Sequence, residues 1–160
     1  MSQAVDILRK YWGYTSFRPL QQQIIDQVME NKDVLALLPT GGGKSLCYQV
    51  PALMMEGVTI VVSPLIALMK DQVNRLNDIG IEAHAIYSGL KPYDIDRQMD
   101  NAQFGKTKLL YLSPERLKSE RFCERLKHLP VNLIAVDEAH CISQWGHDFR
   151  PAYLEIGNVR

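Results

Sequence analysis

The sequence predicts an α/β fold: a doubly wound sheet of mainly parallel strands with helices on both faces. Short apolar runs of strand length alternate with amphipathic stretches, which is the pattern of βαβ units. Several runs are apolar at nearly every position, as expected for parallel strands covered on both faces. The predicted strands are residues 34–38, 58–62, 83–87, 108–112 and 132–136.

The stretches between these runs carry helical spacing. Pro19 fits the first turn of the first such helix, and Gly57 and Gly80 follow helical stretches as stops. Pro51 lies inside a helical pattern, so a kink or a break is expected there. The apolar positions that repeat on one face are Ile24, Ile25, Val28 and Met29 in one set, and Leu65, Leu68, Met69 and Leu76 in another, which Gln72 interrupts.

Composition sets broad limits on the function. A chain of 160 residues with 46% hydrophobic residues can build one domain with a sizeable core. Eighteen basic residues balance eighteen acidic ones, so nucleic acid would have to be bound by a local surface. The most basic stretch is Lys106–His128, where a solvated helix face is the more ordinary interpretation.

The chain has three cysteines, and none is paired at a short spacing. This argues against a disulfide framework or a structural zinc site, and it fits a reducing cytoplasm. No apolar stretch approaches the roughly 18 residues of a membrane span, and no export signal begins the chain. We therefore expect a cytoplasmic protein without a membrane partner, in a bacterial cytoplasm or nucleoid. Residues 153–160 carry no stop signal, so the 160 residues are expected to be one incomplete lobe of a larger protein.

A candidate phosphate site follows the first predicted strand. Thr40, Gly41, Gly42 and Gly43 precede a Lys-Ser pair, and a helical stretch opens next. Strand, glycine-rich turn, Lys-Ser and helix together form the P-loop context, in which backbone N–H groups cradle phosphate oxygens. The alternative is a glycine-rich turn that binds nothing, and Leu38 stands where the strict signature has Gly. In the P-loop interpretation Lys44 reaches the β and γ phosphates of ATP and the Ser45 hydroxyl ligates Mg²⁺.

Two acidic residues follow the last predicted strand. Asp137 is the candidate ligand of Mg²⁺, and Glu138 is the candidate base for the attacking water, so both join Lys44 as catalytic candidates. Ligands of open α/β sheets bind beyond the carboxyl ends of the strands, and Lys44 and Asp137 are both expected at such ends. The alternative is an acidic pair that caps the next helix. His140 lacks partner ligands for a metal site, so a role in coupling ATP to a second lobe is favoured.

At this point the sequence resembles a known family. Residues 137–140, Asp-Glu-Ala-His, together with the P-loop resemble superfamily two helicases, and three further stretches narrow the resemblance to RecQ DNA helicases. These stretches are residues 12–22, 63–72 and 141–151, and Leu110–Arg116 also fits. The resemblance runs from about Trp12 to the end of the chain and implies a RecA-like first helicase lobe.

The first stretch resembles the adenine-recognition motif of that family. The resemblance implies that Tyr14 stacks on the base, Arg18 helps to hold the nucleotide and Gln21 reads the adenine edge. A Gln amide is chemically suited to that task, because it pairs with N6 and N7 of adenine at once. Leu20 stands where the motif usually has Gly, which is tolerable unless the backbone needs a positive φ there.

The other two stretches resemble nucleic-acid contacts. Ser63, Pro64 and Leu65 match the motif that touches the nucleic-acid backbone, although without the resemblance a plain strand-to-helix junction would be the better interpretation. Residues 141–151 match the aromatic-rich loop of RecQ helicases, which couples DNA binding to ATP hydrolysis. Its candidate DNA-binding residues are Trp145, Phe149 and Arg150, and its candidate coupling residues, with His140, are Gln144 and His147.

The resemblance implies an ATP-dependent 3′ to 5′ DNA helicase acting in repair and recombination. Its partners would be single-stranded or duplex DNA and a second RecA-like lobe, and its cofactors ATP and Mg²⁺. Without the second lobe, the chain alone is expected to bind ATP weakly and hydrolyse it poorly. The alternatives are an RNA helicase or remodelling ATPase of the same superfamily, a non-hydrolysing module switched by ATP, and a small-molecule P-loop kinase.

Overall fold

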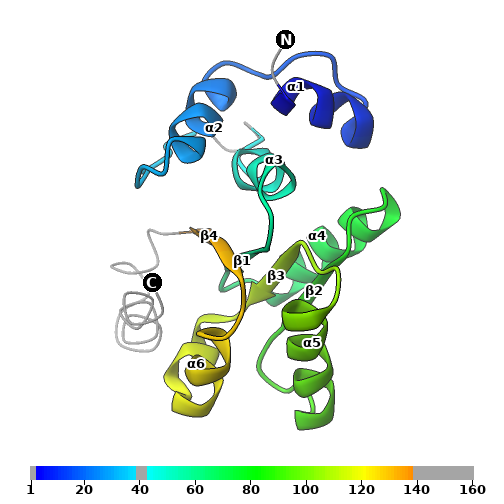
Figure 1. The fold of residues 1–160 in the computed structure, drawn as a ribbon, viewed down its shortest axis with the longest axis vertical. Coiled ribbons are helices and arrows are strands. Elements are labelled where there is room, and N and C mark those ends of the chain that lie inside the picture. Colours follow the sequence, from blue (N-terminus) through cyan, green and yellow to red (C-terminus); the bar gives the residue numbers. More distant parts are fainter. Residues whose placement is uncertain (1–2, 39–42, 139–160) are drawn as a thin grey trace. The chain divides into compact units, whose positions relative to one another are not determined.

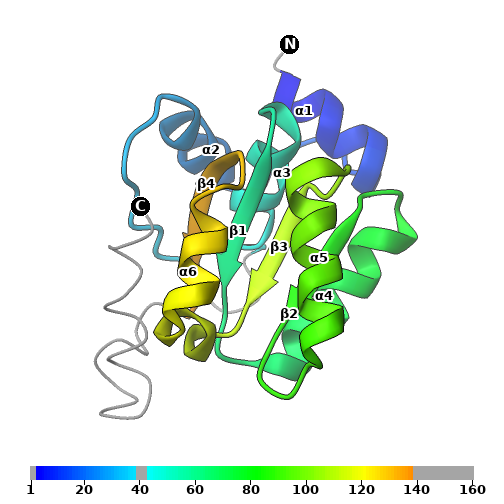
Figure 2. The ribbon, with the colours of Figure 1, turned by 60° about the horizontal axis from the view of Figure 1, so that its bottom comes forward.

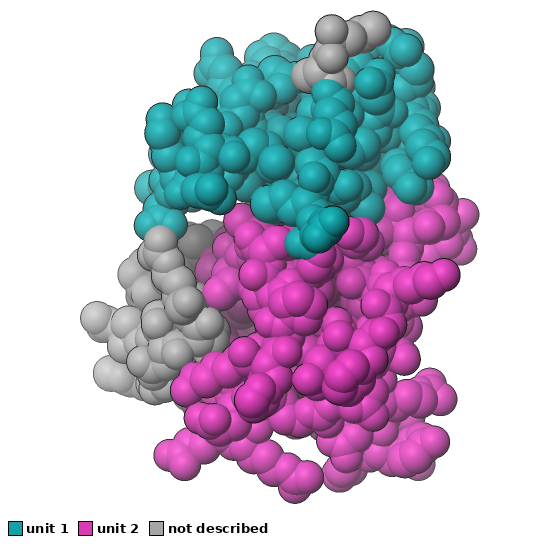
Figure 3. All heavy atoms as spheres, in the orientation of Figure 1, with its two compact units in different colours: residues 1–56 teal, residues 57–160 magenta. Residues whose placement is uncertain are grey.

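The computed structural model describes residues 3–38 and 43–138. Its chain divides into two compact units, residues 1–56 and 57–160, which Figure 3 colours separately. Each unit is built around its own hydrophobic cluster. Each unit is described in turn, and the assignment of residues 1–160 to one helicase lobe stays a prediction.

The first unit is helical in its described part. It contains α1 (Gln3–Ile7), the π-helical turn η1 (Leu8–Trp12), α2 (Gln21–Met29) and α3 (Leu46–Met54) (Figure 1). Ala4, Ile25 and Val50 form the buried centre, one from each of the α-helices. α3 runs through Pro51 without ending there, so a break at this proline is wrong. Pro19 lies before α2 and outside its first turn.

The prediction of a buried strand over residues 34–38 is wrong in this structure. These residues form no strand, and Leu35 and Leu37 are 78% and 79% exposed. An apolar run becomes a strand only when a neighbouring strand satisfies its backbone N–H and C=O groups. The described part of the first unit contains no strand, so the run has no such neighbour there.

The second unit contains a four-stranded sheet in the order β2–β3–β1–β4, and every pairing is parallel. The strands are β1 (Val58–Val62), β2 (Ala83–Ile86), β3 (Leu109–Leu112) and β4 (Val131–Val136). The connecting elements are α4 (Ile66–Asp78), α5 (Pro92–Phe104), the 3₁₀ turn η2 (Pro114–Lys118) and α6 (Glu120–Leu126). Four of the five predicted strands are thus confirmed, with ends within a residue or two of those predicted.

Helices cover both faces of this sheet, as predicted. Figures 1 and 2 show α5 and α6 on one side of the sheet and α4 on the other. The α5 and α6 side buries alternate strand residues together with Met99, Phe122 and Leu126. The strand residues of this core are Val58, Ile60, Val62, Ile86, Leu110 and Leu112. β4 is half-buried rather than buried, because it is an edge strand of the described sheet.

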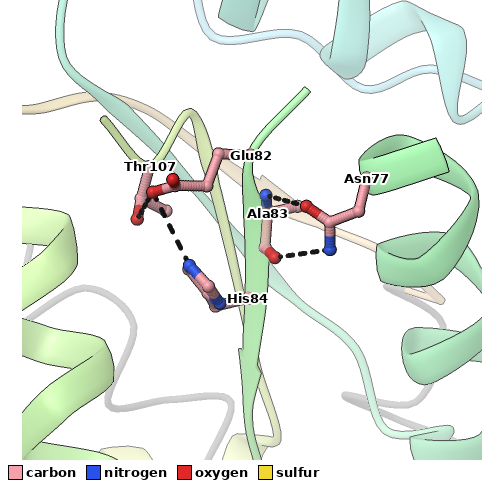
Figure 4. Close-up of polar contacts among 5 residues, drawn as sticks. All are labelled: Asn77, Glu82, Ala83, His84 and Thr107. Carbon is pink, nitrogen blue, oxygen red and sulfur yellow. Dashed lines mark hydrogen bonds and ion pairs between the residues drawn. The ribbon is translucent and has the colours of Figure 1, made fainter. Parts of the chain in front are cut away.

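The opposite edge, at β2, is closed by a side chain. Asn77 from the last turn of α4 donates to the Ala83 carbonyl (3.1 Å) and accepts from the Ala83 N–H (3.2 Å), as a neighbouring strand would (Figure 4). On the other side of β2, Glu82 accepts a hydrogen bond from the Thr107 hydroxyl (3.0 Å), and its carboxylate lies 3.6 Å from His84 Nε2. Edge strands expose a template for unwanted pairing, and Asn77 blocks part of it.

Candidate nucleotide and nucleic-acid site

In the first unit, a tight turn presents Gln21. The Gln21 N–H donates to the Arg18 carbonyl (3.2 Å), which closes a four-residue turn with Pro19 and Leu20 at its centre. Leu20 has φ 74° and ψ −24°, the values of the third residue of a type II turn. That position requires a positive φ and is normally Gly, so the condition under which Leu20 is unfavourable is met.

The Gln21 carboxamide is fixed by two main-chain groups. Its Oε1 accepts from the Arg18 N–H (2.8 Å), and its Nε2 donates to the Gly43 carbonyl (2.8 Å). The side chain is buried, with Gln21 only 1% exposed. Because one group is a donor and the other an acceptor, the amide is held in a single orientation. The turn of residues 18–21 is therefore joined to the glycine-rich segment.

The described end of the glycine-rich segment leads directly into α3. Gly43 has φ +75°, and a Cβ built on it would lie 2.4 Å from Gln21 Nε2, so a side chain at this position would collide with that amide. The first turn forms through hydrogen bonds from Leu46 N–H to the Gly43 carbonyl (3.2 Å) and from Gln49 N–H to the Ser45 carbonyl (2.9 Å). Lys44 is exposed at this helix start, where the positive end of the helix dipole favours phosphate.

Tyr14 and Arg18, the other predicted nucleotide residues of this unit, are both exposed. Tyr14 is 57% exposed, so more than half of this residue's surface is open to solvent. Thr40, Gly41 and Gly42 lie outside the described residues. Cys47, in the first turn of α3, is buried, and burial raises the pKa of its thiol to about 11. A thiol with that pKa stays protonated at neutral pH and is a poor nucleophile.

In the second unit, several predicted site residues come directly after the strands, which end at the same level of the sheet. Val62, Ile86, Leu112 and Val136 are in register across the sheet. The ladder continues by one step: Asp137 N–H donates to Val62 O (2.9 Å), Ser63 N–H to Leu112 O (2.9 Å) and Ser113 N–H to Ile86 O (3.1 Å). Since side chains alternate between faces, those of Ser63, Ser113 and Asp137 lie on the face opposite the α5 and α6 core.

Asp137 and Glu138 form a tight element at the end of β4. Asp137 is 9% exposed, and its Oδ1 accepts a hydrogen bond from the Glu138 N–H (3.0 Å). Glu138 has φ 56°, a left-handed conformation that is uncommon for a residue with a side chain and often occurs at functional sites. A buried carboxylate at a strand end is a suitable oxygen ligand for Mg²⁺, so the residues present fit the expected ion.

The edge also carries residues that the sequence prediction did not single out. Lys70 Nζ of α4 lies 4.4 Å from the centroid of the Tyr87 ring, and Arg116 Nη2 of η2 donates to the Tyr87 carbonyl (2.6 Å). Ser113, 1% exposed, has a hydroxyl oxygen with no hydrogen-bond partner among the residues that the structure describes. Their positions in the sequence could have identified them. Lys70 and Arg116 lie inside two of the stretches that resemble the helicase family, and Tyr87 directly follows β2.

Two helix starts are directed to the same edge. α4 follows β1 and α5 follows β2, and neither has a side-chain cap on its first turn. Ser63 is buried, whereas Leu65, the residue before α4, is exposed. Uncapped N–H groups at the start of a helix attract phosphate oxygens. Besides Thr40, Gly41 and Gly42, six more predicted residues fall outside the described part of the chain: His140, Gln144, Trp145, His147, Phe149 and Arg150.

Comparisons with known proteins identify the family of the chain. The sequence model of the DEAD/DEAH box helicase family matches residues 18–159. Over 157 residues the chain is 48% identical to the ATP-dependent DNA helicase RecQ of Pasteurella multocida and 50% identical to that of Bacillus subtilis. These matches cover 98% of the chain but only 25% and 27% of the relatives. The resemblance to RecQ helicases is confirmed, and the chain spans about a quarter of their length.

Solved structures support the fold. A hypothetical ATP-dependent RNA helicase from Sulfolobus tokodaii matches with a TM-score of 0.71 over 99% of the chain and 46% of its own, at 21% identity. The helicase MrfA bound to DNA and AMPPNP matches with a TM-score of 0.67 over 88% of the chain and 21% of its own, also at 21% identity. No helix of the described residues is long and apolar enough to span a membrane. The chain belongs to the DEAD/DEAH box helicase family.

Proposed function

We propose that this member of the DEAD/DEAH box helicase family is the first motor lobe of an ATP-dependent DNA helicase. In the intact protein it would bind Mg-ATP and single-stranded DNA and couple ATP hydrolysis to 3′ to 5′ unwinding in repair and recombination. The observation that carries the proposal is the common level at which Ser63, Ser113 and Asp137 leave their strands. It brings the nucleic-acid-like motif and the carboxylate to one sheet edge, where α/β proteins bind ligands.

The proposed nucleotide residues act through different chemistry. Tyr14 stacks on adenine, Arg18 assists, and Gln21 reads the base edge. Residues 40–43 and the start of α3 cradle the phosphates, and Lys44 neutralises the β and γ phosphates. Ser45 and Asp137 are the residues proposed to hold Mg²⁺, which would neutralise charge on the phosphate oxygens.

Hydrolysis and DNA binding are assigned to the second unit. Glu138 orients and deprotonates the attacking water, and its left-handed backbone fixes the start of its side chain relative to Asp137. The DNA backbone is bound by Ser63, Pro64 and Leu65 and by the uncapped start of α4. Lys70 and Arg116 add positive charge beside it.

The remaining roles concern the aromatic-rich loop and the intact protein. We assign stacking on unpaired bases to Trp145 and Phe149, a phosphate contact to Arg150, and coupling to His140, Gln144 and His147. A second RecA-like lobe would close on the nucleotide and move the strand during each cycle. We place the protein in the cytoplasm, where ATP and chromosomal DNA are both available to a bacterial helicase.

Nucleotide binding can be tested by thermal unfolding of the chain with Mg-ATP or Mg-GTP, because a ligand that binds only the folded state raises the midpoint. We expect a larger rise with ATP than with GTP, no rise in Lys44→Ala, and loss of the ATP preference in Gln21→Ala. A clear transition that neither nucleotide moves, in the chain and in the intact protein alike, contradicts the proposed ATP site.

A further inference from the structure

A tyrosine lies between the two basic residues at the carboxyl ends of the strands, where DNA binding is proposed. Lys70 Nζ is 4.4 Å from the centroid of the Tyr87 ring, and Arg116 Nη2 donates to the Tyr87 carbonyl (2.6 Å). We propose that Tyr87 is a positioning residue for DNA binding: its ring holds the Lys70 ammonium at this edge without neutralising the charge. This role rests on the proposed function of the edge as a DNA site.

The place of Tyr87 follows from the register of the sheet. Ile86 pairs with Leu112, and the ladder continues through the bond from the Ser113 N–H to the Ile86 carbonyl (3.1 Å). Ile86 belongs to the core on the α5 and α6 side, and side chains alternate along a strand, so the Tyr87 ring lies on the opposite face of the sheet. The contact with Lys70, a residue of α4, agrees with this placement.

The backbone of Tyr87 is fixed independently of its ring. Its carbonyl accepts two hydrogen bonds, from Arg116 Nη2 (2.6 Å) and from the Leu90 N–H (3.3 Å). The first bond joins Tyr87 to the 3₁₀ turn η2, and the second closes a turn that leads to α5. Because both bonds use the main chain, a change of the Tyr87 side chain is expected to leave Arg116 in place and to alter only the contacts of the ring.

An aromatic ring holds a cation in a different way from a carboxylate. The ring face attracts the cation through its quadrupole and carries no net charge, so the ammonium keeps its full charge. Within residues 3–38 and 43–138, neither Lys70 nor Arg116 lies within ion-pair distance of a carboxylate. Both positive charges are therefore available to DNA phosphates. The ring also restricts the lysine side chain before DNA binds, which reduces the entropy lost on binding.

The test is binding of a fluorescein-labelled single-stranded oligothymidylate to the intact protein, measured by anisotropy over a range of salt concentrations. Tyr87→Leu removes the ring and is expected to weaken binding about two- to fivefold, whereas Tyr87→Phe keeps the ring and should bind like the wild type. Lys70→Ala removes one phosphate contact, so the slope of log affinity against log salt concentration should become shallower by about 0.7.

A double-mutant cycle shows whether Tyr87 acts through Lys70. In a Lys70→Ala background, Tyr87→Leu is expected to have no further effect. An equal loss in both backgrounds overturns the inference, because Tyr87 would then act on DNA or on the fold directly. Tyr87→Phe binding as weakly as Tyr87→Leu, or Tyr87→Leu binding like the wild type, also overturns it. A wild type that does not bind the oligonucleotide overturns the proposed function itself.

Thermal unfolding of each variant identifies temperatures at which all are folded, and binding is compared there. If Tyr87→Leu does not fold, pentafluorophenylalanine at position 87 takes its place in the comparison with Tyr87→Phe. This residue keeps the shape of the ring but reverses the quadrupole, so it no longer attracts a cation. Weaker binding than that of Tyr87→Phe supports the inference, and equal binding overturns it.

Discussion

The turn before α2 and the strand ends of the second unit are both assigned to ATP chemistry, yet they are built differently. Around Gln21, geometry depends on side-chain hydrogen bonds to main-chain groups and on a strained residue, Leu20. At the strand ends, Ser63, Ser113 and Asp137 are placed by main-chain bonds that continue the sheet. The first region depends on a few particular side chains, and the second depends on the register of the whole sheet.

This difference predicts different responses to mutation. A side-chain change in the first region removes or redirects one of these hydrogen bonds, so binding is affected. A side-chain change at a strand end leaves the backbone where the ladder holds it, so only the chemistry of that side chain is lost. Disturbing the position of the strand ends requires a change in the core beneath them.

The largest expected effect is that of Glu138→Gln. Gln has the same size and can adopt the same backbone, but it does not accept a proton at neutral pH. We expect ATP hydrolysis by the intact protein to fall by about 10²- to 10⁴-fold, while the affinity for Mg-ATP changes little. Phosphate release and calorimetric binding measure the two quantities. Lys44→Ala is the matched control from the first unit, where binding itself should be lost.

An equal loss of binding and hydrolysis in Glu138→Gln would contradict the comparison, since the strand end would then be shaping the nucleotide site rather than supplying a reactive group. Retention of full hydrolysis would remove Glu138 from the mechanism. Asp137 stays the proposed Mg²⁺ ligand in either case, and its Oδ1 accepts a hydrogen bond from the Glu138 N–H.

The second effect concerns the core that sets the strand register. Leu110 of β3 is fully buried against α5 and α6. Replacing it with Ala is expected to lower the free energy of unfolding by about 2–5 kcal/mol, as other large-to-small core changes do. Leu35→Ala removes the same side chain from a site that is 78% exposed, and a change of less than about 0.5 kcal/mol is expected. Urea unfolding of both variants compares the two sites, and similar losses would show that residues 34–38 are buried in solution.

The same pair of residues shows what the sequence could and could not predict about the fold. The apolar runs predicted β1 to β4 correctly, because each of these runs pairs with a neighbouring strand and is covered by helices. Residues 34–38 carry an equally apolar pattern but form no strand. Periodicity reports which side chains prefer burial, and it does not report whether a partner strand is present. The order of the strands and their common register are likewise properties of pairing, which a single chain pattern does not contain.

For the candidate site, the sequence predicted which residues are involved better than it predicted the contacts that hold them in place. The resemblance singled out Gln21 and Leu20, and only the structure shows that Leu20 occupies a position needing positive φ and that Gln21 bonds to Gly43. The Lys70–Tyr87–Arg116 cluster was not predicted, because its members come from three separate elements that become neighbours only in the folded sheet. Whether the assigned residues bind ATP and DNA stays a prediction.

The smallest effect tests the strain in the first region. Leu20→Gly should relieve a left-handed conformation that costs a residue with a side chain about 1–2 kcal/mol, while the greater freedom of Gly in the unfolded chain returns about 0.4–1 kcal/mol of that gain. A net rise in unfolding free energy of about 0.5–1 kcal/mol is therefore expected. Leu20→Ala is the matched control, because it removes the half-exposed side chain but keeps the Cβ and hence the strain. Chemical unfolding of both variants gives the difference in unfolding free energy.

A Gly variant no more stable than the Ala variant would mean that the turn of residues 18–21 relaxes to negative φ at little cost. The bond from Arg18 to the Gln21 side chain would then be an adjustable contact, and the contrast with the strand ends would weaken.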